Sequence, residues 1–235
     1  MLSVMLLSSS KIPGSKYLGY CIDEIREFLQ GKGRMLFVPF AYQEPDTYTD
    51  QVRETLGGFV DIVGAHTLTA NDDLDRFDVV FCGGGNTFLL LSALYQHGLL
   101  DRIRSVVNKG ASYLGSSAGA NVACPTISTT NDMPIVYPPS FSSLGLVPFN
   151  INPHYYETPQ DFPHTGECRR DRIAEFLAIH QRTVVGMEEG AILLRKDNRL
   201  HLVGSKGGLI FYPHGEEQPV LPGDDLSFLL TNTAL

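Results

Sequence analysis

The sequence is poor in three features that mark common classes of protein: paired cysteines, long apolar runs and positive charge. Its four cysteines are scattered and form no Cys-x-x-Cys pair, so they give little support to a zinc or redox site. No apolar run approaches the ~20 residues needed to cross a bilayer. Residues 1–8 are apolar but lack the basic start of a signal peptide. We therefore expect a cytoplasmic protein with reduced thiols and no membrane association.

The shortage of positive charge excludes further partners. The chain carries 18 Lys and Arg against 26 Asp and Glu, a net charge of −8 over 235 residues. Nucleic acids and anionic membranes both require a basic face, so neither is expected to bind. An acidic small molecule needs only a local cationic pocket and is not excluded. The length fits one domain over residues 1–235.

The first two-thirds of the chain alternate short apolar runs with segments of helical periodicity. This alternation is typical of parallel strands joined by crossover helices. Strands are expected at residues 2–7, 35–40, 60–63, 77–82 and 111–114, and helices at 18–29, 47–56, 87–97 and 100–108. We predict an α/β fold with a mostly parallel sheet flanked by helices.

After Pro125 the pattern changes. Residues 125–165 are rich in Pro, Ser, Thr and Asn, and we expect this stretch to be irregular and functional. A helix is expected at 170–180. Four short strands, expected to form a partly antiparallel edge, follow at 183–187, 191–194, 200–203 and 209–212.

Residues 115–119 read Gly-Ser-Ser-Ala-Gly and directly follow one of the expected strands. Gly-x-Ser-x-Gly is the pattern of a nucleophile elbow, where a strand turns sharply into a helix and exposes a serine hydroxyl. Glycine is needed on both sides because the turn brings backbone segments close together. We predict Ser117 as the nucleophile, with the backbone N–H of Ala118 facing a developing oxyanion.

A serine nucleophile needs a base, and the base needs a group that orients it. We favour His154, which stands in Asn-Ile-Asn-Pro-His-Tyr within the irregular stretch. The remaining histidines lie at expected element ends, in a strand, or in loops and turns: His66, His97, His164, His180, His201 and His214. The residues alone leave the acid open among Glu188, Glu189, Asp132 and Glu157.

Gly83-Gly84-Gly85-Asn86-Thr87 follows an expected strand and opens a helix. Backbone amides in such a loop can approach a phosphate or form the second half of an oxyanion hole. The dinucleotide fingerprint lacks its third glycine, and no Gly-Lys-Ser/Thr follows. We favour the oxyanion role, with a turn that binds no ligand as the alternative.

Three arginines, Arg169, Arg170 and Arg172, begin the helix expected near residue 170. A guanidinium group can hold a carboxylate by two parallel hydrogen bonds. The alternative is a solvated helix face, with Asp171 as a neighbouring charge.

Five motifs occur in order along the chain and together carry a resemblance. They are Gly83-Gly84-Gly85-Asn86-Thr87-Phe88, Ser117-Ala118-Gly119-Ala120-Asn121, Thr129-Thr130-Asn131-Asp132-Met133-Pro134-Ile135-Val136, Ile151-Asn152-Pro153-His154 and Glu189-Gly190. The chain resembles peptidase E, the α-aspartyl dipeptidase family of serine peptidases, over nearly its whole length. The resemblance implies a fold related to the class I glutamine amidotransferases, which is flavodoxin-like, and hydrolysis of dipeptides with an N-terminal aspartate.

The resemblance also implies roles for single residues. The triad falls on Ser117, His154 and Glu189, which selects one acid from the four left open. The oxyanion donors fall on the N–H groups of Gly85 and Ala118. Three residues are implied to bind the substrate: Arg169 its aspartate side chain, Asp132 its amine, and Asn86 beside them. No cofactor or metal is implied, and either a monomer or a homodimer is expected.

One departure from the expected pattern and two rival interpretations remain beside this one. Ser116 occupies a position where a bulkier aromatic residue is expected, which should alter packing beside the nucleophile and substrate preference. The order Ser, His, acid differs from the Ser, acid, His order of α/β-hydrolases, which argues against an esterase. The first rival is a cyanophycinase-like or isoaspartyl-cleaving serine hydrolase. The second is a catalytically silent protein that binds a small molecule.

Overall fold

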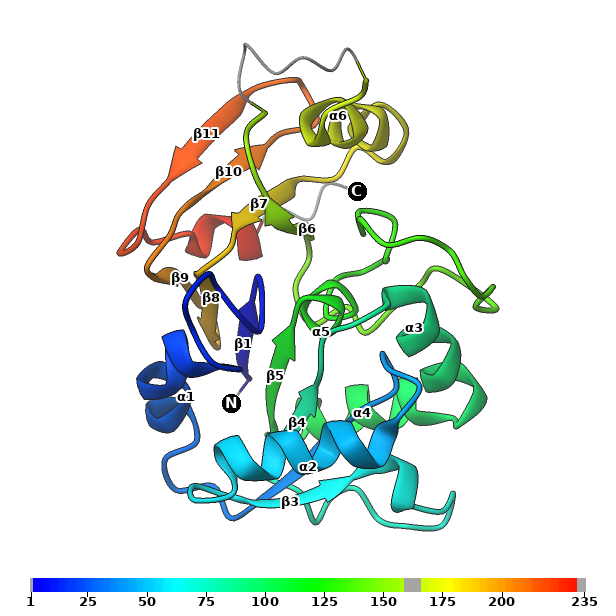
Figure 1. The fold of residues 1–235 in the computed structure, drawn as a ribbon. Coiled ribbons are helices and arrows are strands. Elements are labelled where there is room, and N and C mark those ends of the chain that lie inside the picture. The colour runs from blue at the N-terminus through cyan, green and yellow to red at the C-terminus, as the bar shows by residue number, and fades with distance from the viewer. Residues whose placement is uncertain (1, 159–165, 232–235) are drawn as a thin grey trace.

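The structure is a computed structural model that describes residues 2–158 and 166–231, and its strands form two sheets (Figure 1). The larger sheet has seven strands in the order β3-β2-β4-β5-β1-β8-β9, and the smaller has four in the order β11-β10-β7-β6. The larger comprises β1 (Ser3–Leu7), β2 (Arg34–Val38), β3 (Asp61–Gly64), β4 (Val79–Cys82), β5 (Ser112–Ser116), β8 (Ala191–Lys196) and β9 (Arg199–Gly204). The smaller comprises β6 (Asn150–Tyr155), β7 (Val184–Glu188), β10 (Gly208–Phe211) and β11 (Glu217–Val220).

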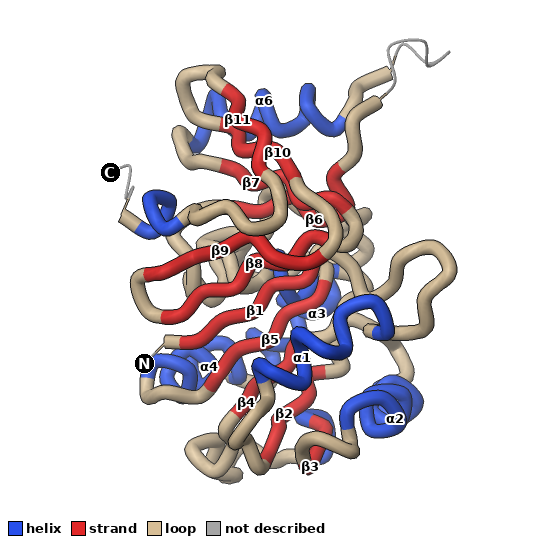
Figure 2. The backbone as a smooth tube through the Cα atoms, turned by 90° about the vertical axis from the view of Figure 1, so that its left-hand side faces the viewer, coloured by secondary structure: helices blue, strands red, loops and turns tan. Residues whose placement is uncertain are grey.

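Helices cover both faces of the seven-stranded sheet, with α1 and α2 on one side and α3, α4 and the short α5 on the other (Figure 2). Alternate side chains of each strand point to opposite faces, so neighbours such as Leu6 and Leu7 enter different cores. The helices are α1 (Ile22–Phe28), α2 (Pro45–Leu56), α3 (Thr87–Gln96), α4 (Leu99–Asn108), α5 (Ala118–Asn121) and α6 (Arg169–His180).

The smaller sheet has its own apolar contact with α6. Ile173, Phe176 and Leu177 of that helix pack with Tyr155 of β6 and with residues of β7 and β10. Short 3-10 helices occur at Gly19–Cys21, Ala65–Thr67 and Ser227–Leu230. No helix within the described residues has the length and apolar character required to cross a membrane.

The predicted α/β architecture is confirmed. Strands β1 to β5 are parallel, and β8 and β9 form the predicted antiparallel edge beside β1. Two of the strands expected near that edge, β7 and β10, instead pair in the second sheet. Periodicity identifies a strand from its own side chains but does not say with which neighbour it pairs.

The prediction that residues 125–165 are irregular is wrong at β6, and residues 159–165 lie outside the described part. Asn and Pro disfavour strands, so Asn-Ile-Asn-Pro gives no strand signal. Tertiary contacts override this preference: the Asn150 side chain donates to the carbonyl of Thr126 (2.8 Å), and that of Asn152 to the carbonyl of Thr129 (2.9 Å). Strand β11 was also not predicted. It lies at a sheet edge and is mostly exposed, which is where a strand tolerates Pro219.

The backbone at Gly119 lies so close to strand β4 that a larger residue at this position is predicted to destabilise the fold. A Cβ atom at this position would lie 1.8 Å from the Cys82 carbonyl oxygen, which belongs to the neighbouring strand. We expect Gly119→Ala to lower the free energy of unfolding by about 3 kcal/mol or more, since neither backbone can yield. Thermal unfolding followed by circular dichroism measures the effect. The control is Gly58→Ala, where the new methyl group meets no atom within 4 Å; equal melting temperatures of the two variants would contradict the prediction.

Candidate active site

Ser117 lies in the turn between β5 and α5 and has an unusual backbone conformation, with φ 51° and ψ −108°. A non-glycine residue at positive φ is strained and needs support from its surroundings. The flanking glycines supply room for the turn, because a Cβ atom on Gly115 would lie 2.5 Å from the Gly119 carbonyl oxygen. The elbow geometry predicted from Gly-x-Ser-x-Gly is therefore present.

His154 approaches Ser117 from the other sheet. It lies near the end of β6, and its Nε2 is 2.7 Å from the Ser117 Oγ. Its φ is 55°, at a point where the pairing of β6 with β7 shifts register. Strand β5 and strand β6 thus bring the two side chains together at the junction of the sheets (Figure 1).

Two polar residues that the sequence analysis missed hold the backbone of His154. The Ser8 hydroxyl accepts from the His154 amide (2.9 Å) and donates to the Met187 carbonyl (2.8 Å). The Asn131 side chain donates to the Pro153 carbonyl (2.8 Å). The run of serines after the first expected strand was an available signal, because ligands gather at the carboxyl ends of parallel strands.

Glu189 lies in the turn that leads from β7 of the smaller sheet to β8 of the larger. Its Oε1 is 2.8 Å from the His154 Nδ1. The other candidate acids have different partners. Glu157 pairs with Arg170 and accepts from the Tyr155 hydroxyl, while Glu188 lines a separate depression.

The glycine loop follows β4, the neighbour of β5, and reaches Ser117. A Cβ atom on Gly84 would lie 3.3 Å from the Ser117 Cβ, so a side chain there would crowd the elbow. The Gly85 amide donates no hydrogen bond to any residue that the structure describes. Ala118 is the first residue of α5, so its N–H has no acceptor within that helix. Two backbone donors are therefore available beside the serine.

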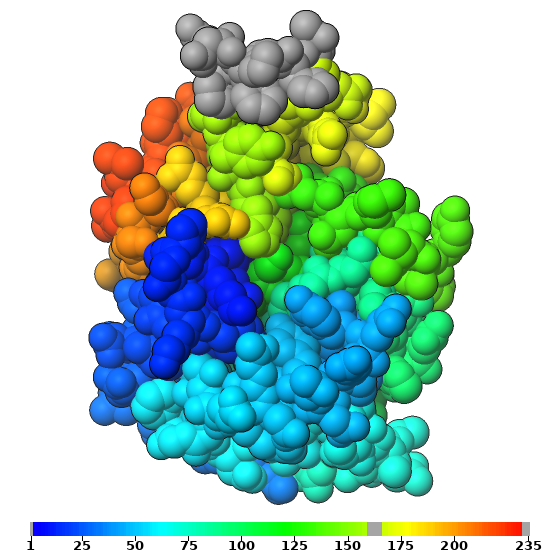
Figure 3. Space-filling model, in the orientation of Figure 1, coloured from blue at the N-terminus to red at the C-terminus, as the bar shows by residue number. Residues whose placement is uncertain are grey.

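Ser117 and His154 open onto a cleft of about 910 Å³ that is also lined by Gly84, Gly85 and Asp132. Its other wall is formed by α2 and the segment before it, and by residues near the N-terminus. Figure 3 shows the hollow where the N-terminal segment (blue), the start of α2 (light blue) and the segment carrying β6 (yellow-green) meet. The cleft is large enough to admit a dipeptide beside the serine.

Asp132, a predicted substrate contact, lines this cleft, whereas Asn86 only follows Gly85 of its lining; both residues have part of their polar groups engaged. The Oδ2 of Asp132 accepts from the amide (2.8 Å) and the hydroxyl (2.6 Å) of Thr87. The Asn86 side chain is the N-cap of α3: its Oδ1 accepts from the Leu89 amide (3.0 Å) and its Nδ2 donates to the Met133 carbonyl (2.9 Å).

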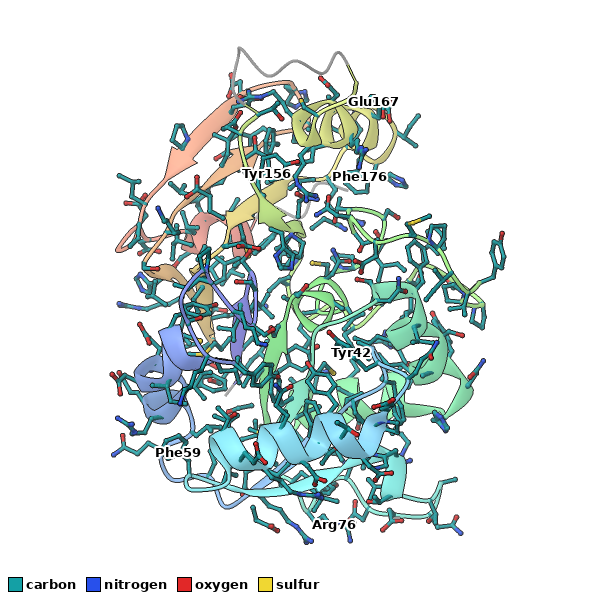
Figure 4. All side chains as sticks on the ribbon, viewed as in Figure 1. Tyr42, Phe59, Arg76, Tyr156, Glu167 and Phe176 are labelled. Atoms are coloured by element: carbon teal, nitrogen blue, oxygen red, sulfur yellow. The ribbon has the colours of Figure 1, made fainter. Side chains whose placement is uncertain are left out.

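Arg169 is the first residue of α6, and its guanidinium carbon lies 4.8 Å from the centre of the Tyr156 ring, which Figure 4 labels. Burial lowers the pKa of the Arg169 guanidinium, and its Nε finds no hydrogen-bond acceptor in the described part of the chain. Arg170 differs, since it pairs with Glu157 and Glu217. The structure therefore separates the arginines predicted from the sequence: Arg169 carries no ion pair among the described residues.

Ser116, the residue that departs from the expected pattern, is fully buried. Its hydroxyl has no hydrogen-bond partner within the residues described. A bound substrate cannot touch it, so any effect on substrate preference has to act through the packing of the elbow.

A serine in a strained turn after a parallel strand, hydrogen-bonded through histidine to a carboxylate, is the arrangement of a serine hydrolase. Comparison with known proteins shows to which family within this class the chain belongs. The family model described as peptidase family S51 matches residues 4–203, and the chain belongs to that family. It is therefore a serine-type peptidase, and the resemblance drawn from the five motifs is confirmed.

Individual relatives cover almost the entire chain. Peptidase E of Streptomyces coelicolor is 43% identical over 233 residues, covering 97% of this chain and 95% of its own. A protein of Drosophila melanogaster named probable alpha-aspartyl dipeptidase is 42% identical over 234 residues, covering 97% of each. The crystal structure of a peptidase from an acI-B1 Actinobacterium superposes with a TM-score of 0.71 over 96% of each chain; at 19% identity this likeness concerns the fold.

Proposed function

We propose that the protein hydrolyses dipeptides with an N-terminal aspartate, using Ser117, His154 and Glu189 as its catalytic triad. The observation that carries the proposal is the continuous hydrogen-bonded chain from the Ser117 Oγ through His154 to Glu189, open to a cleft. The substrate class is supported by the relative named probable alpha-aspartyl dipeptidase, at 42% identity over 97% of the chain.

The geometry supports a two-step mechanism. His154 Nε2 takes the proton of the Ser117 hydroxyl as Oγ attacks the carbonyl carbon of the aspartyl residue. The amides of Gly85 and Ala118 stabilise the resulting oxyanion. His154 then gives the proton to the leaving amine as the C–N bond breaks. Water, activated by the same histidine, releases aspartate from the ester on Ser117, while Glu189 holds the Nδ1 side of the ring.

We assign recognition of the aspartyl residue to side chains whose charges are opposite to those of its carboxylate and its amine. The half-buried Arg169 guanidinium, which has no carboxylate partner among the described residues, suits the substrate's side-chain carboxylate. The Oδ1 of Asp132, which accepts no hydrogen bond within the described residues, is proposed to accept the substrate's amine from within the cleft. The backbone around Asn86 completes the contact, because the amide side chain of that residue is already engaged.

All groups in this scheme come from one chain, so we propose a single catalytic domain over residues 1–235 that works as a monomer or a homodimer, without cofactor or metal. A cytoplasmic location is part of the proposal. Its support is that the four cysteines are free thiols. Burial raises the pKa of Cys21, Cys82 and Cys124 to about 12, which keeps these thiols protonated.

The deciding experiment is release of free aspartate from Asp-Leu, with β-Asp-Leu and Leu-Leu as parallel substrates. Cleavage of Asp-Leu alone supports the proposal. Cleavage of β-Asp-Leu, or release of β-Asp-Arg from cyanophycin, would instead support the isoaspartyl and cyanophycinase alternative. Failure to cleave any of these peptides, together with no labelling of Ser117 by a fluorophosphonate, would favour the catalytically silent binding protein.

Replacing Glu189 by glutamine tests which carboxylate orients the histidine. We expect kcat for Asp-Leu to fall by about 10³- to 10⁴-fold, because the amide no longer stabilises the imidazolium or fixes its tautomer. Steady-state release of aspartate measures the change. The matched control is Glu188→Gln, which alters the adjacent carboxylate and leaves activity within about twofold. A larger loss in the control than in Glu189→Gln would overturn the assignment.

A further inference from the structure

The glycine loop is held by backbone hydrogen bonds on both sides of Gly85. Before it, the Gly83 amide donates to the Val38 carbonyl (3.2 Å), and after it the Asn86 amide donates to the Ala41 carbonyl (3.0 Å). Both acceptors lie at or just beyond the end of β2. The two ends of the loop are therefore fixed by the main chain of a neighbouring strand.

The middle of the loop is held by a side chain. The hydroxyl of Tyr48, a residue of α2, lies against the backbone of Gly83 and Gly84. The contact is close: a Cβ atom on Gly83 would lie 2.5 Å from the Tyr48 hydroxyl oxygen and 2.8 Å from its ring. The Gly85 amide, between the two fixed ends of the loop, has no acceptor among the described residues.

Tyr48 is itself fixed from several sides. Its side chain is buried, with 7% of the residue exposed, and its ring stands edge-on to Phe37 at 4.9 Å between centres. The Tyr17 hydroxyl donates to the Tyr48 hydroxyl (3.3 Å). Burial raises the pKa of Tyr48 to about 12, so the group remains a neutral hydroxyl, which accepts from Tyr17.

We propose that Tyr48 is a positioning residue for peptide hydrolysis. By its close contact with Gly83 and Gly84, its hydroxyl sets the orientation of the peptide that follows and directs the Gly85 N–H toward the oxyanion of the tetrahedral intermediate. The inference rests on the proposed function, because it requires Gly85 to be an oxyanion donor. Such a donor acts on charge that develops in the transition state, so disturbing it lowers kcat without weakening substrate binding.

The test is Tyr48→Phe, which keeps the ring and removes only the hydroxyl. We expect kcat for Asp-Leu to fall by about 10- to 100-fold, with KM within about twofold of the parent value. A second readout uses an aspartyl aldehyde, which forms a tetrahedral adduct with the serine. Its inhibition constant should rise by a similar factor, whereas that of free aspartate, which forms no adduct, should not change.

Two further tyrosine variants accompany Tyr48→Phe, one as a control and one as a second test. Tyr20→Phe removes another partly buried hydroxyl, which donates to the Ser9 carbonyl (2.8 Å) away from the loop, and should leave kcat unchanged. Tyr17→Phe removes the hydrogen bond that the Tyr48 oxygen accepts and should lower kcat by about threefold. If Tyr48→Phe fails to fold, the same measurements on Tyr17→Phe decide the question, and an unchanged kcat there counts against the inference.

The inference and the proposed function fail in different ways. If Ser117→Ala abolishes activity while Tyr48→Phe leaves kcat and aldehyde binding unchanged, Tyr48 has no positioning role. A loss in Tyr48→Phe that lies wholly in KM would also rule out that role. If Ser117→Ala retains activity, the proposed mechanism itself is overturned.

Discussion

Replacing Ser117 by alanine is expected to lower kcat for Asp-Leu by about a million-fold, because neither the attacking oxygen nor the covalent intermediate remains. KM should change little, since the hydroxyl contributes to bond formation rather than to holding the substrate. Single-turnover release of aspartate at high enzyme concentration measures the residual rate.

The chain supplies a matched control for this variant in the preceding residue. Ser116 is also a serine, but it is fully buried and its hydroxyl has no partner among the described residues. Ser116→Ala should therefore retain activity within a few-fold of the parent. Comparable losses in the two variants would show that damage to the elbow, rather than loss of the nucleophile, caused the effect.

Replacing His154 by alanine is expected to lower kcat by about 10⁵- to 10⁶-fold, because the proton of Ser117 then has no acceptor within hydrogen-bond reach. The double variant with Ser117→Ala should be no slower than either single variant, since the two groups act as a unit. Steady-state and single-turnover rates of aspartate release test both statements.

The control for the histidine is His180→Gln, which changes an exposed residue at the end of α6. It should leave kcat within about twofold of the parent. If the fold-losses in kcat of the Ser117 and His154 single variants multiply in the double variant, the assigned proton transfer is contradicted, because groups that act independently have additive free energies.

The sequence predicts the parts of this molecule that short-range rules control. The parallel strands follow from buried apolar runs, and the turn at Ser117 follows from a local motif, in which a Cβ atom on Gly115 would meet the Gly119 carbonyl oxygen four residues later. The pairing of β7 with β10 and the strand β6 depend instead on partners distant in the chain. Asn150 and Asn152 are accommodated in a strand because acceptors in residues 126–131 bind their side-chain NH2 groups.

The candidate site divides in the same way, into residues that a local motif reveals and residues that depend on distant parts of the chain. The proposed nucleophile is readable from a local motif, and the proposed base from its polar surroundings once a nucleophile requires one. The choice of Glu189 over Glu188 came with the family resemblance, because neighbouring carboxylates in a turn look alike in a pattern. Ser8 was missed for a related reason: its contact with His154 joins residues 146 positions apart, and no local rule links them.

The placement of Ser117 on one sheet and of His154 and Glu189 beyond residue 150 has a consequence for biosynthesis. A ribosome that has released the first 140 residues has delivered five parallel strands and the elbow, but neither the base nor its acid. Strand β1 also still lacks its antiparallel neighbour β8 at that stage. Because domains form from the N-terminus during synthesis, the proposed mechanism implies that the growing chain carries an inert serine and that peptidase activity begins only when the C-terminal third has joined the two sheets.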